Sequence, residues 1–183
     1  YGVRAFHYIT EEVLDIASKM FHISTKREDV LIAGLSMGGY GALRCALEKP
    51  EKFGCCGAFS GAYDLKDMYR MGTGPDGDSV LEGLADDYGA IFGEKKEVPE
   101  EVEIPEIISK VKNKSVQPRV YMMCGTEDFL YKQTCKVREL CEQSLSDFTY
   151  EEWPGHHEWD MWDEAIERML KLFLGEGRID FQD

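Results

Sequence analysis

The sequence predicts an α/β domain built on a mainly parallel sheet. Short apolar runs alternate along the chain with segments of helical spacing, an order typical of strand–helix–strand units. The apolar run over 30–33 is preceded by charged residues and followed by a glycine, a pattern typical of a strand that is buried on both faces. A chain of 183 residues with 43% hydrophobic and 31% charged residues matches one ordinary folded domain. We therefore expect a single domain over residues 1–183.

The first half of the chain contains one complete strand–helix–strand unit. A helix is predicted from Thr10, which can cap it, to about Phe21. Its packed face is formed by apolar residues three or four positions apart: Val13, Ile16, Ala17 and Met20. A buried strand is expected over 30–33, then a small-residue helix from 36 to about 47, then a second strand over 55–59.

The second half repeats the pattern after an interruption. A third strand is predicted over 119–124 and a fourth over 148–153. The helix between them has one apolar stripe: Leu130, Val137, Leu140, Cys141 and Leu145. The last helix spans about 158–174, and its periodic apolar residues are expected to anchor it in the core: Trp159, Trp162, Ile166, Met169 or Leu170, and Phe173. Residues 62–117 break the alternation and are expected to form a cap-like insertion.

Composition argues against several classes of function. The net charge of −14, from 21 Lys and Arg against 35 Asp and Glu, would repel the phosphates of a nucleic acid. No run approaches the roughly 18 consecutive apolar residues that a membrane-spanning helix needs. The first residues also lack the pattern of a signal peptide, which is a positively charged segment followed by an apolar one. We expect neither a nucleic-acid nor a membrane partner.

The cysteine pattern favours reduced, buried thiols and thereby a cytoplasmic protein. The six cysteines have neither paired spacing nor scaffold density. They are Cys45, Cys55, Cys56, Cys124, Cys135 and Cys141. Closely spaced Cys or His pairs are what a zinc site needs, so no metal site is predicted.

The segment Gly34-Leu35-Ser36-Met37-Gly38 carries the strongest chemical signal. This G-x-S-x-G pattern lies between a buried strand and a small-residue helix, which is the context of a nucleophile elbow. So sharp a turn needs neighbours without side chains, and Gly34 and Gly38 meet that need. The backbone N–H of Met37, at the start of the helix, would face the oxyanion formed when Ser36 attacks a carbonyl.

A serine nucleophile predicts a histidine base and an orienting carboxylate, in the chain order Ser, acid, His. Of the four histidines, His7 and His22 precede Ser36. The base is therefore expected to be His156 or His157, which follow the fourth strand.

The acid is expected to be Asp128, just past the third strand at the carboxyl edge of the sheet, where catalytic loops collect. Asp64, after the second strand, is its rival, and Glu127 is the neighbour most easily mistaken for it.

Three segments carry a resemblance to a known family: Gly-Leu-Ser-Met-Gly-Gly-Tyr-Gly-Ala at 34–42, Cys-Gly-Thr-Glu-Asp-Phe-Leu at 124–130 and Gly-His-His-Glu-Trp-Asp-Met-Trp at 155–162. They resemble the tributyrin esterases of the esterase D-like group, which also holds the feruloyl and acetylxylan esterases of carbohydrate esterase family 1. The resemblance implies an α/β-hydrolase fold with Ser36 as nucleophile, Asp128 as acid and His157 as base.

The resemblance also implies that this chain is the C-terminal portion of the fold. The sheet of the family has eight strands, whereas only four are predicted here and the chain starts with a helix. We expect the second oxyanion donor to lie upstream of Tyr1. The elbow strand would otherwise be an exposed apolar edge, which natural sheets avoid.

The elbow with its expected acid and base predicts a serine carboxylesterase acting on small-molecule esters. The resemblance implies short acyl chains, with acetylated or feruloylated carbohydrates as candidate substrates. Trp159 is a candidate substrate contact, no cofactor is needed, and the sequence allows a homo-oligomer. The alternatives are an S-formylglutathione hydrolase-type thioesterase, an acyltransferase with a sugar acceptor, and a non-catalytic binding protein on a hydrolase fold. The segment with Trp159 and Trp162 fits the thioesterase less well.

Overall fold

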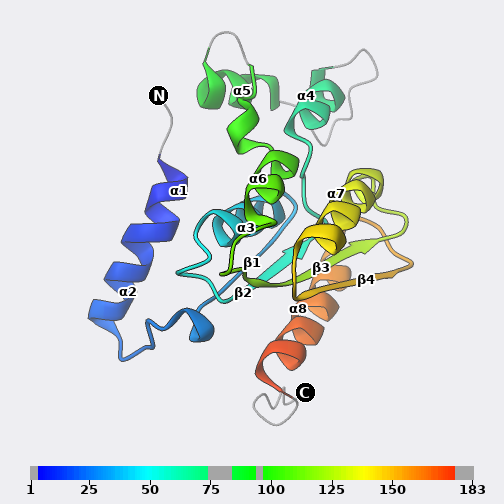
Figure 1. Ribbon diagram of the computed structural model, residues 1–183. Helices are drawn as coiled ribbons and strands as arrows, with labels where there is room; N and C mark the ends of the chain where they lie inside the picture. The colour runs from blue at the N-terminus through cyan, green and yellow to red at the C-terminus, as the bar shows by residue number, and fades with distance from the viewer. Residues whose placement is uncertain (1–3, 74–83, 94–96, 176–183) are drawn as a thin grey trace.

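Four parallel strands form the centre of the protein in the order β1-β2-β3-β4 (Figure 1). They are β1 (Leu31–Leu35), β2 (Cys55–Phe59), β3 (Arg119–Gly125) and β4 (Phe148–Trp153). The structure is a computed structural model, in which residues 4–73, 84–93 and 97–175 are described. Each strand pairs with the next in parallel register, so all four carboxyl ends lie at one edge of the sheet.

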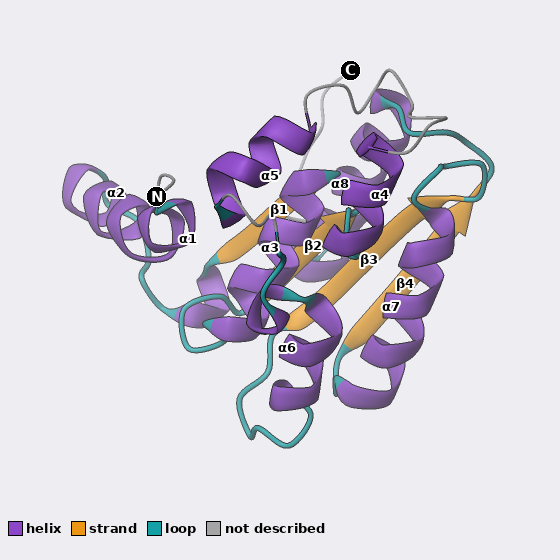
Figure 2. Ribbon diagram, turned by 90° about the horizontal axis from the view of Figure 1, so that it is seen from above, coloured by secondary structure: helices purple, strands orange, loops and turns teal. Residues whose placement is uncertain are grey.

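Helices cover both faces of this sheet. One face carries α3 (Met37–Glu48), α6 (Ile104–Val111) and α7 (Tyr131–Ser144), and the other carries α8 (Trp159–Leu174) (Figures 1 and 2). Alternate residues of β3 point to opposite faces, as the pleat requires. Val120 and Met122 join the core under α3, α6 and α7, whereas Tyr121 and Met123 pack with α8.

The predicted strands agree with the observed ones to within two residues. In this chain β1 is not buried on both faces, as its apolar run predicts, but is the partly exposed edge strand expected where the upstream part of the fold does not cover it. Ala33 is exposed, and the other four residues of β1 are only half-buried. Among the described residues, β1 pairs only with β2. α8 packs mainly against β2 and β3, so it leaves one face of β1 partly open.

The N-terminal helix begins earlier than predicted, so Thr10 is not its cap. Helical structure runs through α1 (Ala5–His7), a π-helical turn (Tyr8–Val13) and α2 (Leu14–Met20). Thr10 lies in the middle of this helix, fully buried, and its hydroxyl donates to the carbonyl of Phe6 at 2.8 Å.

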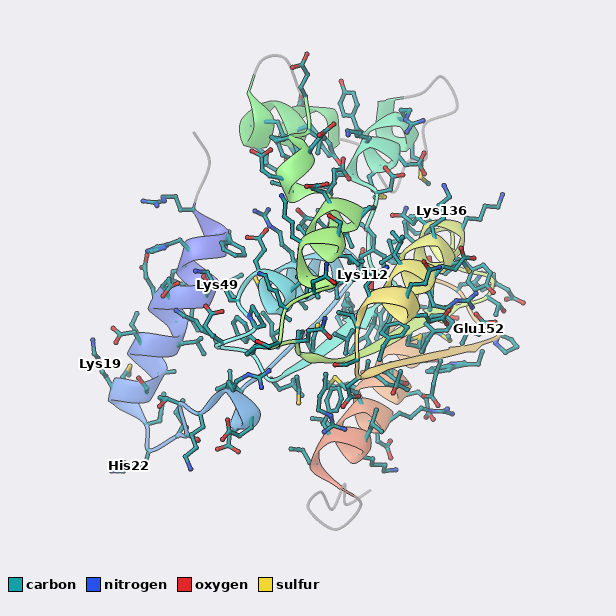
Figure 3. All side chains as sticks on the ribbon, in the orientation of Figure 1. Lys19, His22, Lys49, Lys112, Lys136 and Glu152 are labelled. Carbon is teal, nitrogen blue, oxygen red and sulfur yellow. The ribbon has the colours of Figure 1, made fainter. Side chains whose placement is uncertain are left out.

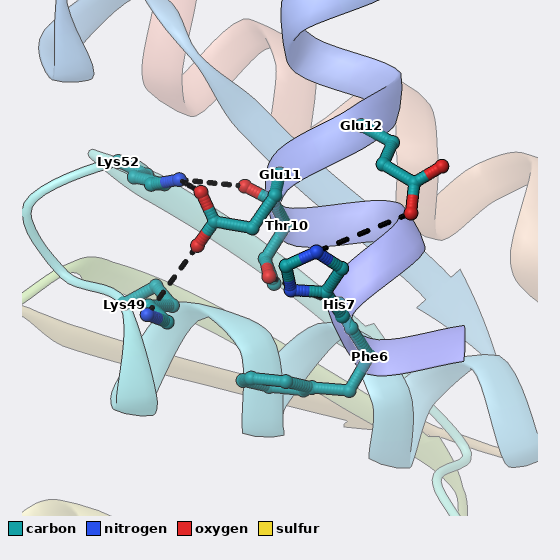
Figure 4. A network of polar contacts seen from close by, with 7 residues as sticks. All are labelled: Phe6, His7, Thr10, Glu11, Glu12, Lys49 and Lys52. Atoms are coloured by element: carbon teal, nitrogen blue, oxygen red, sulfur yellow. Dashed lines mark hydrogen bonds and ion pairs between the residues drawn. The ribbon is translucent and has the colours of Figure 1, made fainter. Parts of the chain in front are cut away.

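The face of this helix that packs is also not the predicted one. Val13, Ile16 and Met20 are exposed, Met20 by 68%. The helix contacts the domain through its other side, where Glu11 pairs with Lys49 and Lys52 (Figure 4). The spacing of apolar residues correctly predicted a helix but not the face that packs against the domain. The π-helical turn changes the spacing of residues along the helix, and the ion pairs of Glu11 hold its other side toward α3. The inner face also presents its own apolar side chains to the core: Phe6 and Leu14.

The last helix is predicted correctly in extent but only partly in packing. Trp162 and Met169 are buried as expected, whereas Trp159 is 67% exposed and Ile166 is exposed as well. The buried stripe is completed by residues close to the predicted one: Met161 and Ala165. The predicted and the observed buried residues both have helical spacing, so only the contacts of the helix with the sheet show which of them are buried.

Residues 62–117, which are expected to form a cap-like insertion, contain two helices that stand above the main body and one that packs into the core (Figure 1). Residues 74–83 and 94–96 lie outside the described part. Helices α4 (Leu65–Thr73) and α5 (Leu84–Phe92) stand above the main body (Figure 1), joined by a ring contact between Tyr69 and Tyr88 at 5.0 Å. A 3-10 turn (Glu100–Val102) leads into α6, which packs in the helical layer on the sheet through three buried isoleucines: Ile104, Ile107 and Ile108.

All six cysteines are free, and all except the half-buried Cys135 are buried, as predicted. Within the described ranges, no helix combines the length and the apolar character needed to cross a bilayer.

We predict that Gly34→Ala destabilises the protein strongly. A Cβ on Gly34 would overlap the carbonyl of Gly38, and neither backbone can move without breaking β1 or α3. Overpacking of this kind costs about 3 kcal/mol, which corresponds to a fall in Tm of roughly 6 to 12 °C. Gly41→Ala is the matched control, because its Cβ would meet nothing within 4 Å. Thermal unfolding followed by circular dichroism should show an unchanged or raised Tm for Gly41→Ala, and equal Tm values for the two variants would contradict the prediction.

Candidate active site

Ser36 occupies a strained turn between β1 and α3. Its φ of 55° and ψ of −122° lie in a region that residues with a side chain rarely adopt. The backbone of β2 supports this conformation, because the N–H of Ser36 donates to the carbonyl of Phe59 at 3.0 Å. Gly34 must lack a side chain, but the same expectation for Gly38 is wrong, because a Cβ there would point into open space.

Met37 is the first residue of α3, so its N–H has no partner within the helix. The positive end of the helix dipole lies at the same place. Because Met37 directly follows Ser36, this N–H is suited to stabilise negative charge on an oxygen bonded to the serine.

Asp128 and His157 are joined by a hydrogen bond. The Nδ1 atom of His157 lies 2.8 Å from Oδ2 of Asp128, and the N–H of Leu130 donates to Oδ1 at 2.8 Å. The carboxylate is buried, with 5% of the residue exposed. Burial opposes ionisation, but the hydrogen bonds from His157 and Leu130, together with the nearby hydroxyl of Ser60, outweigh it, so the pKa of Asp128 lies below its usual value. Asp128 is therefore a buried carboxylate able to orient and charge-stabilise the imidazole.

Two aromatic rings contact the imidazole of His157. Phe129 lies 4.7 Å from the His157 ring, and Trp162 meets it edge-on at 4.9 Å. These contacts limit rotation of the ring and leave its side chain 17% exposed. The sequence analysis missed Phe129, and only its position next to Asp128 could have suggested a role.

The loops that carry the acid and the histidine are bonded to each other along their length. The N–H of Thr126 donates to the carbonyl of Trp153 at 3.0 Å, and the N–H of Glu127 donates to the carbonyl of Gly155 at 3.1 Å. These bonds continue the β3–β4 pairing beyond the strands, so the Asp128–His157 contact rests on a rigid support.

The rival residues have other partners. Asp64 begins α4, where its Oδ1 accepts from the N–H of Asp67 at 2.8 Å. Glu127 and His156 form an exposed ion pair with 3.1 Å between Oε2 and Nε2. Because the adjacent pair is buried and this one is exposed, the structure separates the two candidate histidines.

The two remaining histidines lie elsewhere. His7 faces Glu12 across the N-terminal helix at 4.0 Å (Figure 4), and His22 lies just past the far end of α2 (Figure 3).

Ser36 lies at the same sheet edge as Asp128 and His157 but makes no hydrogen bond to either of them among the described residues. Catalytic hydrogen bonds are commonly long without substrate and shorten in the bound complex. A second residue that the sequence analysis missed is Ser60, which follows β2 at this edge and approaches Asp128. Over the described ranges, no group of three or more His, Cys, Asp or Glu is arranged to hold a metal ion.

Comparison with known proteins identifies relatives over most of the chain. The family described as "Putative esterase" matches residues 3–173. An acetyl esterase of Caldicellulosiruptor saccharolyticus is 30% identical over 161 residues, which are 87% of this chain and 59% of that protein. S-formylglutathione hydrolase of Rattus norvegicus is 40% identical over 57 residues, which are 31% of this chain and 20% of that protein.

Solved structures give the same picture. FphF, a fluorophosphonate-binding serine hydrolase of Staphylococcus aureus with substrate bound, matches with a TM-score of 0.77 and 29% identity over 95% of this chain and 65% of its own. S-formylglutathione hydrolase FrmB of the same organism matches with a TM-score of 0.75 and 28% identity over 92% of this chain and 63% of its own. These matches confirm the α/β-hydrolase fold. The chain spans about three-fifths of the length of the acetyl esterase and of these two structures.

We predict that Asp128→Asn weakens the dependence of stability on pH. The carboxyl of Asp128 has a lower pKa in the folded protein than its usual 3.8, so the unfolded chain binds the proton first as pH falls. Its contribution to stability is present above about pH 4 and is lost as pH falls through the folded pKa. Urea unfolding between about pH 7 and pH 3 should show a steeper loss of stability in the wild type than in Asp128→Asn. Glu127→Gln, at the adjacent exposed pair, should follow the wild type, and parallel curves for all three proteins would contradict the prediction.

Proposed function

The chain belongs to the esterase family, and we propose that it is a serine carboxylesterase that hydrolyses short-chain acyl esters through Ser36, His157 and Asp128. The observation that carries the proposal is the buried hydrogen bond of 2.8 Å between His157 and Asp128, at the sheet edge where the strained Ser36 lies. The acetyl esterase relative favours an acetyl group as the acyl part.

In the proposed reaction, Oγ of Ser36 attacks the ester carbonyl while Nε2 of His157 takes its proton. The imidazolium is stabilised by Asp128 through the Nδ1–H bond, and the N–H of Met37 donates to the oxyanion. His157 then gives the proton to the leaving alcohol, which breaks the ester bond and leaves an acyl group on Ser36. Water, deprotonated by His157, releases the acid and restores the serine.

Trp159 is the substrate contact that we propose beside this site. Its indole is 67% exposed at the start of α8, and it meets Trp162 edge-on at 5.3 Å. Trp162 in turn contacts His157, so the exposed ring is two contacts from the base. An exposed aromatic face of this kind packs well against the apolar face of a sugar or an aryl group.

S-formylglutathione hydrolysis is the second candidate, because FrmB and the rat enzyme are both relatives. The negative charge around the proposed site favours a neutral ester over S-formylglutathione as substrate. S-formylglutathione is an anion at neutral pH, and the loop and helix around His157 carry several exposed acids: Glu127, Glu158, Asp160 and Asp163. Like charges near the site slow the approach of an anionic substrate.

We predict that Ser36→Ala and His157→Ala each lower kcat on p-nitrophenyl acetate by about four to six orders of magnitude, because each removes a group that the reaction requires. His156→Ala is the matched control for the base. Its exposed pair with Glu127 is worth about 1 kcal/mol or less, so activity should change only a few-fold.

Covalent labelling of the same variants, followed by intact mass measurement, tests the assignment of the nucleophile and the base independently of turnover. A fluorophosphonate should add one adduct to the active protein that contains this chain, and the adduct should be absent in Ser36→Ala and nearly absent in His157→Ala. Retained labelling in Ser36→Ala, or equal losses of activity in His156→Ala and His157→Ala, would refute the assignment.

We also predict that the two candidate substrates respond differently to salt. Between about 20 and 200 mM NaCl, kcat/KM for S-formylglutathione should rise several-fold, because salt screens the acidic surface, while the value for a neutral acetyl ester should stay nearly constant. At low salt, the acetyl ester should be the better substrate by about ten-fold or more. A higher kcat/KM for S-formylglutathione at low salt would instead support the thioesterase.

A further inference from the structure

Ser60 is the second strained residue at the sheet edge that carries the proposed active site. Among described residues other than glycine, only Ser36 and Ser60 have a positive φ, and that of Ser60 is 43°. Glycine adopts this conformation without strain, whereas serine adopts it at a cost in free energy. A serine here therefore suggests that its side chain is needed.

The segment around Ser60 links the nucleophile to the strand that carries the acid. Phe59 accepts a hydrogen bond from the N–H of Ser36 at 3.0 Å, and the N–H of Ala62 donates to the carbonyl of Ser36 at 3.1 Å. Between these two contacts, the N–H of Ser60 donates to the carbonyl of Met123 at 2.7 Å. Ser60 is thus held from both sides, which explains how its strained backbone is maintained.

The hydroxyl of Ser60 is completely buried and makes no hydrogen bond of good geometry. It nevertheless lies beside the carboxylate of Asp128, where it helps to hold the pKa of that carboxyl below its usual value against the opposing effect of burial. The thiol of Cys124 is its other polar neighbour, and burial raises the pKa of that thiol to about 12. A buried hydroxyl without a partner is costly, and a carboxylate has about four lone-pair positions. Two of those positions on Asp128 are taken by His157 and Leu130, so a third donor can be accepted.

We propose that Ser60 is a positioning residue for the acid of the site, donating its hydroxyl proton to Asp128 so that the carboxylate keeps its orientation toward His157. This inference rests on the proposed esterase function, because it assigns Ser60 a part in the same reaction. Ser60 acts through Asp128 and does not touch the substrate.

The test compares Ser60→Gly and Ser60→Ala with Thr134→Val. Glycine relieves the backbone strain and removes the hydroxyl, whereas alanine removes only the hydroxyl. Thr134 is the matched control, because its hydroxyl is also fully buried and without a partner, and it lies beside Cys124. For p-nitrophenyl acetate, we expect kcat to fall about ten-fold in both Ser60 variants with KM unchanged, and to stay within about two-fold in Thr134→Val.

Thermal unfolding distinguishes the effect of losing the Ser60 hydroxyl from the effect of relieving its backbone strain. The Tm of Ser60→Gly should equal or exceed that of the wild type while its kcat falls, a combination that a purely structural role does not produce. Full activity in Ser60→Gly, or an equal loss in Thr134→Val, would overturn the proposal.

Proton NMR gives a readout that does not depend on turnover. The proton between His157 and Asp128 is expected to resonate far downfield, and removal of a donor to Asp128 should shift it in both Ser60 variants but not in Thr134→Val. If the wild type hydrolyses no ester and this shift is still seen, the esterase function fails while the contact of Ser60 with Asp128 stands. An unshifted resonance in both Ser60 variants would overturn the contact itself, whatever the activity.

Discussion

Parallel pairing of four consecutive strands is the constraint on which the site depends. The register sets Leu35 beside Phe59, Phe59 beside Met123, and Gly125 beside Trp153, so the chain leaves every strand at the same edge of the sheet. Parallel strands need crossover connections, and each connection here begins with a loop held between a strand and a helix. Residues more than a hundred positions apart are thereby brought to one edge on rigid supports.

Burial decides the roles of the two carboxylate–histidine pairs at this edge. Asp128 with His157 and Glu127 with His156 have the same chemistry and adjacent positions. The Asp128 carboxylate is out of contact with water, so its hydrogen bonds act in a low dielectric and keep it ionised despite desolvation. The neighbouring pair is solvated on both sides, and water weakens its attraction. The two pairs are thus only one residue apart along each loop, but they differ in environment. The Glu127–His156 pair is a surface contact, whereas the Asp128–His157 pair can stabilise an imidazolium.

Backbone strain is concentrated where the first two strands end. Ser36 and Ser60 both have a positive φ, and each is held by hydrogen bonds to a neighbouring strand or segment. Strain of this kind persists only where the surroundings determine the conformation, and it lowers stability in exchange for a fixed geometry. The polar groups of the site are therefore oriented before any substrate arrives.

The sequence by itself determined the alternation of strands and helices, the sharp turn at Ser36 and the chain order of the candidate nucleophile, acid and histidine, because these depend on local patterns of apolar residues, glycines and polar residues. Residue types and spacing alone did not choose between His156 and His157, which only the family resemblance distinguished, and they kept Asp64 as a rival to Asp128, since adjacent or similarly placed residues of one type differ only in what surrounds them. The tertiary structure assigned Asp64 to the start of α4, turned Trp159 outward and buried Asp128. It also chose the packed face of the N-terminal helix and brought Ser60 against Asp128. Burial and hydrogen-bond partners arise from contacts between distant segments, so no local pattern in the chain can encode them directly.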